Sequence, residues 1–117
     1  MRKIAQGIAE SMGGVCKIDI HRGYPVLHND PTITEAVRQF AKEYLGDENV
    51  VELPLRMTSE DFAYYSQVIP AAFYRLGTGN KARGITSALH TTTFDIDEDS
   101  LETSIGLMAW VAIKMLG

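Results

Sequence analysis

Apolar residues recur at helical spacing over three stretches of the chain, at residues 4–12, 33–44 and 101–115. Glycines follow the first two stretches, at Gly13 and at Gly46, as they commonly do at the ends of helices. The third stretch is apolar almost all round, and a helix of that kind is usually covered on every side. The pattern therefore predicts three helices, of which the last is largely buried.

Polar residues at the starts of helical segments support the same assignment. Asp30 precedes Pro31, which is typical of a helix start: Asp accepts hydrogen bonds from free backbone N–H groups, and Pro fits the first helical position. Asp97 is expected to cap the last helix in the same way. Thr58 or Ser59 is expected to cap a further, short helix between the second and third stretches.

Other segments have the pattern of β-strands. Residues 16–22 alternate between apolar and polar side chains, which is the period of a strand with one buried face. Short apolar runs at 49–53 and 71–76 end at Pro or Gly and indicate two further strands. A long loop is expected at 77–88, followed by an extended segment at 89–94. Helices and strands in this order are typical of layered folds, so the sequence predicts the α/β class.

The composition is that of an ordinary folded domain. The chain has 117 residues, of which 45% are hydrophobic and 22% charged, so burial can offset the entropy lost on folding. A formal net charge of −4 argues against a nucleic-acid partner. The single cysteine, Cys16, excludes an internal disulfide and fits a reducing compartment. The chain has no apolar run of transmembrane length and no signal-peptide core, so we expect a cytoplasmic protein without a membrane partner.

Few residues carry recognisable chemistry. Glu60 and Asp61 either complement the positive end of a short helix or orient a metal ligand or a substrate amine from a cleft. His21, His28 and His90 form no pair four residues apart and have no cysteine nearby, so they make no local metal motif. The residues alone therefore predict an α/β unit without a self-sufficient active site, and they identify no catalytic residue.

Three segments nevertheless resemble a known family in their order and spacing. They are residues 57–63 (MTSEDFA), 68–77 (VIPAAFYRLG) and 89–101 (LHTTTFDIDEDSL). Together they resemble the C-terminal third of the zinc-dependent amidohydrolases, a family that includes aminoacylases, carboxypeptidases, hippurate hydrolases and amino-acid-conjugate hydrolases. The upstream pair Asn29-Asp30 also resembles the family's passage between its two domains.

The resemblance implies a domain organisation and a site. Residues 1–28 would be a helix and an edge strand of a lid or dimerisation domain, and residues 29–117 the C-terminal α/β part of the catalytic domain. His90 matches the family's final metal-binding histidine, and Glu60 and Asp61 match an acidic pair that lines the cleft. Zinc or another divalent metal would be bound in the complete enzyme. The other metal ligands and the general base would lie in an N-terminal catalytic segment, which this chain does not contain.

Two functions from different classes follow from these observations. The first is a fragment of a metal-dependent amidohydrolase that cleaves N-acyl-amino-acid or peptide amide bonds, inactive alone and dependent on the N-terminal segment as its partner. The alternative is a non-catalytic dimerisation or interaction domain, in which the open edge of the strand at 16–22 pairs with a second copy. A third possibility is that the chain folds poorly by itself because its apolar faces lack neighbours.

Overall fold

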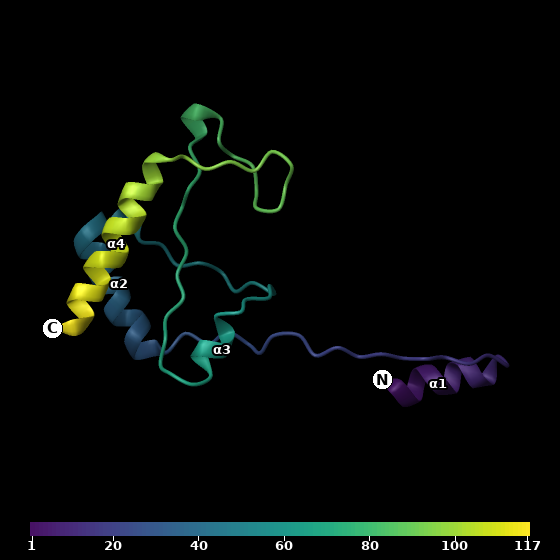
Figure 1. The fold of residues 1–117 in the computed structure, drawn as a ribbon. Coiled ribbons are helices and arrows are strands. Elements are labelled where there is room, and N and C mark those ends of the chain that lie inside the picture. Colours follow the sequence, from purple (N-terminus) through teal and green to yellow (C-terminus); the bar gives the residue numbers. More distant parts are fainter.

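A computed structural model describes all residues from 1 to 117, and it contains helices joined by long extended connectors (Figure 1). The helical elements are α1 (Arg2–Ser11), α2 (Pro31–Leu45), α3 (Ala63–Ser66) and α4 (Asp99–Leu116), with two 3₁₀ turns, η1 (Asp47–Asn49) and η2 (Lys81–Arg83). None of these helices is both long enough and apolar enough to cross a membrane.

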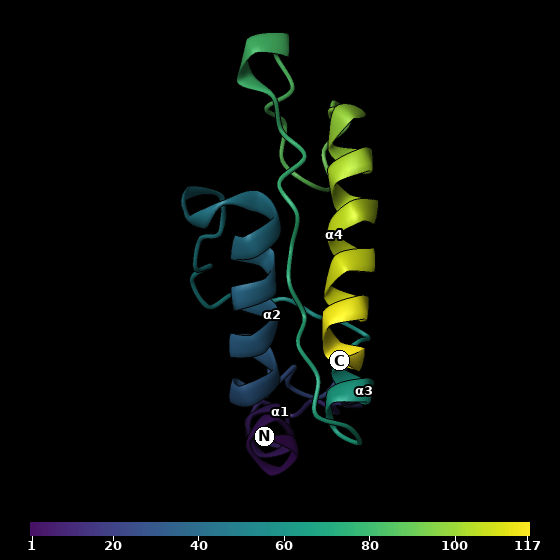
Figure 2. The ribbon, with the colours of Figure 1, turned by 90° about the vertical axis from the view of Figure 1, so that its left-hand side faces the viewer.

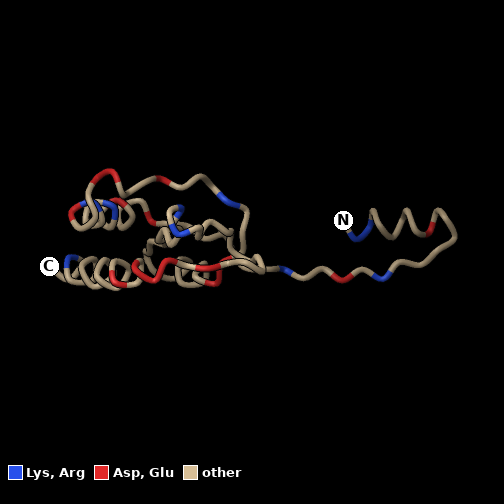
Figure 3. Tube along the Cα trace, turned by 90° about the horizontal axis from the view of Figure 1, so that it is seen from above, with Lys and Arg blue, Asp and Glu red and all other residues tan.

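The molecule is elongated. Its radius of gyration is 21.0 Å, whereas a compact domain of this length has a radius of about 13 Å. It exposes 9850 Å², compared with about 6300 Å² for a folded monomer of the same mass. The N-terminal arm (residues 1–23) projects away from the rest of the chain (Figure 3). Most apolar side chains of this molecule are therefore not covered by the chain itself.

The best-packed region is an antiparallel pair formed by α2 and α4, which lie side by side in both views (Figures 1 and 2). Ala41 of α2 and Leu107 of α4 are buried. Tyr44 lies directly over Gly106, where a Cβ atom would be only 2.0 Å from the tyrosine hydroxyl. The side chain of Tyr44 also faces Trp110, with ring centroids 6.3 Å apart. Because glycine has no side chain, the two helices can approach each other closely at position 106.

The ends of α2 confirm the prediction from the sequence. The Asp30 carboxylate accepts hydrogen bonds from the backbone N–H groups of Thr32 and Ile33, each at 2.9 Å, and Pro31 is the first helical residue. Gly46 ends the helix with a φ of 89°, a conformation that costs little only for glycine. The predicted first helix is also present as α1, and the chain turns at Gly13 with a φ of 74°.

The predicted α/β class is wrong, because the structure contains no β-strand. The one strand-like feature is an isolated antiparallel bridge between Asn80 and Ile85. The segments predicted as strands, 16–22, 49–53 and 71–76, contain no strand, and the second of them begins in η1. In Figure 1 the segment 16–22 lies in the arm beside α1, away from the other two. A strand exists only when a neighbouring segment forms a ladder of backbone hydrogen bonds with it, and no segment of this chain forms such a ladder with them.

Two further expectations about α4 are also wrong. The helix is not largely buried, since Leu107 is its one buried residue and Ile105 and Met108 are exposed. The reason is that only α2 packs against α4, which leaves its other faces open. Asp97 is not the N-cap residue of α4 either, because the residue before the helix is Glu98, whose side chain makes no capping hydrogen bond.

Candidate functional site

His90 lies near the tip of a loop between η2 and α4. It is exposed, and its φ of 63° makes it the one residue other than glycine in the left-handed region. This conformation is uncommon for residues with a side chain and persists where the surrounding structure imposes it. The imidazole is therefore presented to solvent by a backbone with an unusual local shape.

Hydrogen bonds between residues before and after His90 hold the two sides of this loop together. The hydroxyls of Ser87 and Thr93 are 2.9 Å apart and share a hydrogen bond. The Thr91 hydroxyl donates to the carbonyl of Ala88 at 2.8 Å, and the Phe94 N–H donates to the carbonyl of Thr91 at 3.2 Å. Short polar side chains thus close the loop around the histidine.

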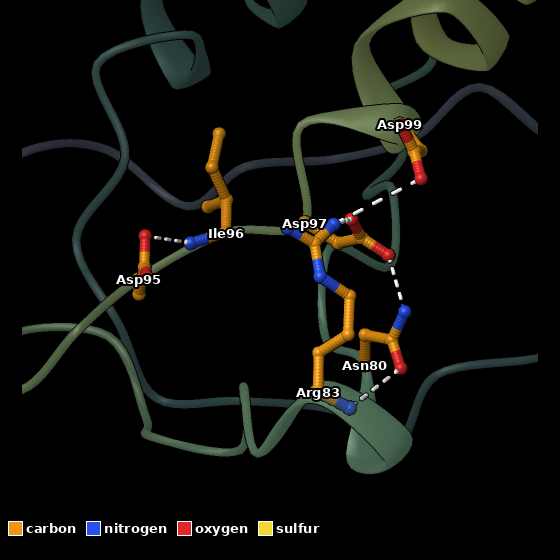
Figure 4. A network of polar contacts seen from close by, with 6 residues as sticks. All are labelled: Asn80, Arg83, Asp95, Ile96, Asp97 and Asp99. Atoms are coloured by element: carbon orange, nitrogen blue, oxygen red, sulfur yellow. Dashed lines mark hydrogen bonds and ion pairs between the residues drawn. The ribbon is translucent and has the colours of Figure 1, made fainter.

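A larger polar network holds the base of the same loop (Figure 4). The Asn80 side-chain amide donates to one oxygen of Asp97 at 2.6 Å, and the Arg83 guanidinium bonds to the other oxygen. The backbone N–H of Asp97 donates to the carbonyl of Thr78 at 2.8 Å. We call the side-chain contacts of Asn80, Arg83 and Asp97 the Asp97 clasp. It joins the segment before the loop to the segment after it.

The electrostatics of the clasp favour the ionised carboxyl group. The hydrogen bond from Asn80 and the nearby charge of Arg83 hold the pKa of Asp97 below its usual value, against the opposing effect of partial burial. Only 13% of the Asp97 side chain is exposed, compared with 90% of Asp99. Sequence reasoning missed this network and assigned Asp97 to the helix cap. The available signal was the pair Asn80 and Arg83 in the glycine-containing loop, together with an acid following it.

Glu60 and Asp61 lie directly before α3. One oxygen of Glu60 accepts a hydrogen bond from the Phe62 N–H at 3.3 Å, while Asp61 is exposed. The backbone carbonyls of both acids accept from the first turn, at Ala63 and Tyr64. These contacts agree with the simpler interpretation, in which the acids support the start of a short helix. The prediction that they line a cleft stays a prediction.

Asn29 has a role that the sequence did not indicate. Its side-chain amide donates to the carbonyl of Phe73 at 2.9 Å and accepts from the N–H of the same residue at 2.8 Å. Next to it, the Asp30 N–H donates to the carbonyl of Ala71 at 2.9 Å. The Phe73 ring packs on Phe62, with centroids 5.5 Å apart. The extended segment at 71–73 is thus fastened to the start of α2 and to the segment that carries Glu60 and Asp61.

The residues present do not form a metal centre by themselves. No three His, Cys, Asp or Glu side chains come together anywhere in the chain, so Glu60, Asp61 and His90 are not gathered around one point. A catalytic zinc ion takes about three protein ligands, and the three exposed histidines, His21, His28 and His90, form no group of ligands. His90 therefore fits a single ligand position, and the prediction that it binds metal stays a prediction.

Comparison with known proteins identifies the family. Residues 4–114 match peptidase family M20/M25/M40, and the chain belongs to this family of hydrolases. It is 39% identical over 92 residues to IAA-amino acid hydrolase ILR1-like 6 from Arabidopsis thaliana, a match that covers 79% of this chain and 20% of that protein. It is 30% identical over 115 residues to thermostable carboxypeptidase 2 from Saccharolobus solfataricus, covering 97% of this chain and 28% of that one. The resemblance inferred from the three sequence segments is confirmed.

The same matches cover only part of the length of each relative. A third relative, the uncharacterized hydrolase y4tI from Sinorhizobium fredii, is 31% identical over 101 residues, which cover 86% of this chain and 25% of that protein. The chain thus spans between 20% and 28% of the length of these curated relatives. No solved structure matches the chain significantly.

Proposed function

We propose that this chain is the C-terminal part of a metal-dependent amidohydrolase that cleaves N-acyl-amino-acid or peptide amide bonds, and that it is inactive alone. Membership of the M20/M25/M40 family supports the hydrolase class. The names of two relatives, an IAA-amino acid hydrolase and a carboxypeptidase, point to an amide bond next to an amino acid as the bond that is cleaved.

The observation that carries this proposal is the incomplete packing of a chain with a clear family signature. Only Ala41, Ala63, Ala71 and Leu107 are buried, although the composition is that of a folded domain. Apolar side chains such as Ile105 and Met108 of α4 are exposed and need a covering surface. The proposed partner that covers them is an N-terminal catalytic segment.

In the complete enzyme, His90 would supply one nitrogen ligand to zinc or another divalent ion, and Glu60 and Asp61 would line the cleft. An ion bound in this way supplies Lewis-acid chemistry and lowers the pKa of a bound water. The chain's own contribution is to present His90 as an exposed residue on a loop that hydrogen bonds close. The remaining ligands and the general base would come from the N-terminal segment.

A graft into a relative tests this proposal. In thermostable carboxypeptidase 2, the matching 28% of the protein would be replaced by this chain. We expect the folded graft to bind zinc and to hydrolyse an N-acylated amino acid, and the isolated chain to hydrolyse none. His90→Asn in the graft is the matched control, because Asn also tolerates a positive φ but removes the imidazole. A folded graft that binds no zinc, or an isolated chain that hydrolyses the substrate, would contradict the proposal.

One feature favours the alternative, a dimerisation domain. The extended segment at 16–22 has no ladder partner, and the apolar residues Ile4, Ile8 and Met12 of the adjacent α1 are exposed. A second copy of this arm would pair the free backbone groups and cover the apolar face. Sedimentation of the isolated chain tests this: a dimer that Ile8→Asp dissociates supports it, and a monomer at all concentrations contradicts it.

A further inference from the structure

The loop that carries His90 is closed twice. At its base, the Asp97 clasp joins Asn80 and Arg83 to the residue that follows the loop. Closer to the tip, the hydroxyls of Ser87 and Thr93 share a hydrogen bond at 2.9 Å. His90 lies between the two sides with a φ of 63°. The outer closure joins Asn80 to Asp97, 17 positions further along the chain, and acts beside the backbone bond from the Asp97 N–H to the Thr78 carbonyl.

Asp97 differs in its contacts from the neighbouring acidic residues Asp95 and Asp99. Asp95 accepts a hydrogen bond only from the neighbouring Ile96 N–H, at 2.8 Å. Asp99 is exposed and lies 3.8 Å from the Arg83 guanidinium. Asp97 alone directs both carboxylate oxygens at donors from the other side of the loop (Figure 4). The backbone N–H of Asp99, at the start of α4, also helps to lower the pKa of Asp97, so the carboxylate serves the loop and the start of the helix together.

We infer that Asp97 is a positioning residue: with Asn80 and Arg83 it closes the loop at its base and so fixes the direction in which His90 is presented. This inference rests on the proposed function, in which His90 is a metal ligand. Hydrogen-bonding groups that orient a ligand without touching the ion commonly control how well the ion is held. A flexible loop loses conformational entropy when its histidine binds a metal ion. The clasp would order the loop before the ion binds and so reduce this cost.

The substitution Asp97→Asn tests the clasp in the full chain. Two donors meet the two carboxylate oxygens, so an asparagine replaces one acceptor by an NH₂ group that faces a donor. Asp95→Asn is the matched control, because it makes the same chemical change two residues away without facing Asn80 or Arg83. We expect Asp97→Asn to lower the backbone order parameters at 86–94 from about 0.85 to below about 0.6. We also expect it to broaden the imidazole signals of His90.

The control variants separate positioning from general damage to the fold. The helical circular dichroism signal should be the same in Asp97→Asn and Asp95→Asn, because an asparagine at position 97 still has an oxygen that can accept from the Asp99 N–H at the start of α4. Arg83→Lys, which keeps the charge, should retain more loop order than Arg83→Ala. If Asp97→Asn leaves the loop order and the His90 signals equal to those of Asp95→Asn, the inference is overturned.

The graft described above distinguishes this inference from the proposed function. In that protein, Asp97→Asn should weaken zinc binding by roughly 10-fold to 100-fold, while Asp95→Asn leaves it unchanged. A native graft that binds no zinc overturns the proposed function, and the NMR comparison still decides whether the clasp orders the loop. A native graft that binds zinc equally well with Asp97→Asn overturns the positioning role alone.

Discussion

The pair of helices α2 and α4 and the N-terminal arm are built from equally clear sequence patterns, yet they differ in packing. In the pair, residues from distant parts of the sequence meet: Tyr44 lies over Gly106, and the Lys114 ammonium is 2.8 Å from the Glu43 carboxylate. In the arm, α1 has no buried residue, and its one side-chain bond to the following segment runs from Arg2 to the carbonyl of Ile18 at 2.9 Å.

The difference shows that periodicity determines which segments form helices, whereas stability depends on whether a partner covers the apolar face. The apolar residues Ile4 and Ile8 share one face of α1, as Ala41 and Tyr44 share one face of α2. Only the second face has a helix against it. Most helical stability in proteins comes from such packing and not from propensity, so we expect the two regions to respond differently to the same kinds of change.

The largest effect is expected for Leu107→Ala. Leu107 is 2% exposed, and truncating a buried leucine costs about 2–5 kcal/mol. Urea unfolding followed by the fluorescence of Trp110 would measure the loss, because this residue lies beside Tyr44 between the helices. Ile105→Ala is the control on the same helix: Ile105 is 71% exposed, and the change should stay within about 0.5 kcal/mol. Equal losses from both variants would show that the helices do not pack as described.

Glycine-to-alanine substitutions should have opposite signs in the two regions. At Gly106 the new Cβ would lie 2.0 Å from the Tyr44 hydroxyl, so the ring must move, at a cost of about 1–3 kcal/mol. At Gly7 in α1 nothing lies within 4 Å, so alanine should stabilise the helix by about 1 kcal/mol through its better propensity. Thermal unfolding and helical circular dichroism would measure both.

A second substitution identifies the cause at position 106. If contact with the tyrosine ring is responsible, Gly106→Ala should become neutral or stabilising in a Tyr44→Leu background. A penalty that persists in this background would contradict the close approach of the two helices.

A smaller effect is expected at the start of α2. Asp30→Ala removes two hydrogen bonds to the first turn and should cost about 1 kcal/mol, while Asp30→Asn should retain most of the stability. The start of α1 has no side-chain cap to lose, since Met1 precedes it. Urea unfolding of the two Asp30 variants would measure the difference. An equal loss in both would mean that the charge, and not the cap, stabilises the helix.

The smallest effect is expected from acid on the Asp97 clasp. The lowered pKa of Asp97 in the folded chain means that its contribution is fully present above the ordinary carboxyl value of about 3.9 and is lost as pH falls through the lowered value. The side-chain amide signals of Asn80 should therefore shift below about pH 4. Asp97→Asn should abolish this shift, and Asp95→Asn should retain it. A carboxyl signal of Asp97 that titrates at or above its ordinary value would contradict the clasp.

The sequence allowed some elements to be predicted and others not. The start of α2 at Asp30 and Pro31 and its end at Gly46 were predicted correctly, because caps act within a few residues of the backbone they serve. The strands at 16–22 and 71–76 were predicted wrongly, because a strand needs a neighbour that sequence alternation cannot supply. The Asp97 clasp was missed because its members are separated by up to 17 residues.

The amino-acid sequence alone determined where α2 begins and ends and where α1 ends, and it carried the three segments that identify a hydrolase family. These features depend on local backbone geometry or on residue identity, which are both present in a linear chain. Only the tertiary structure decided that α2 and α4 pack together, that Asn29 fastens the segment at 71–73, and that Asp97 turns toward Asn80 and Arg83. These contacts join residues far apart in sequence, so they form only in the folded chain. Hydrophobic periodicity shows which face of a helix is apolar, but it does not show which distant segment will pack against that face.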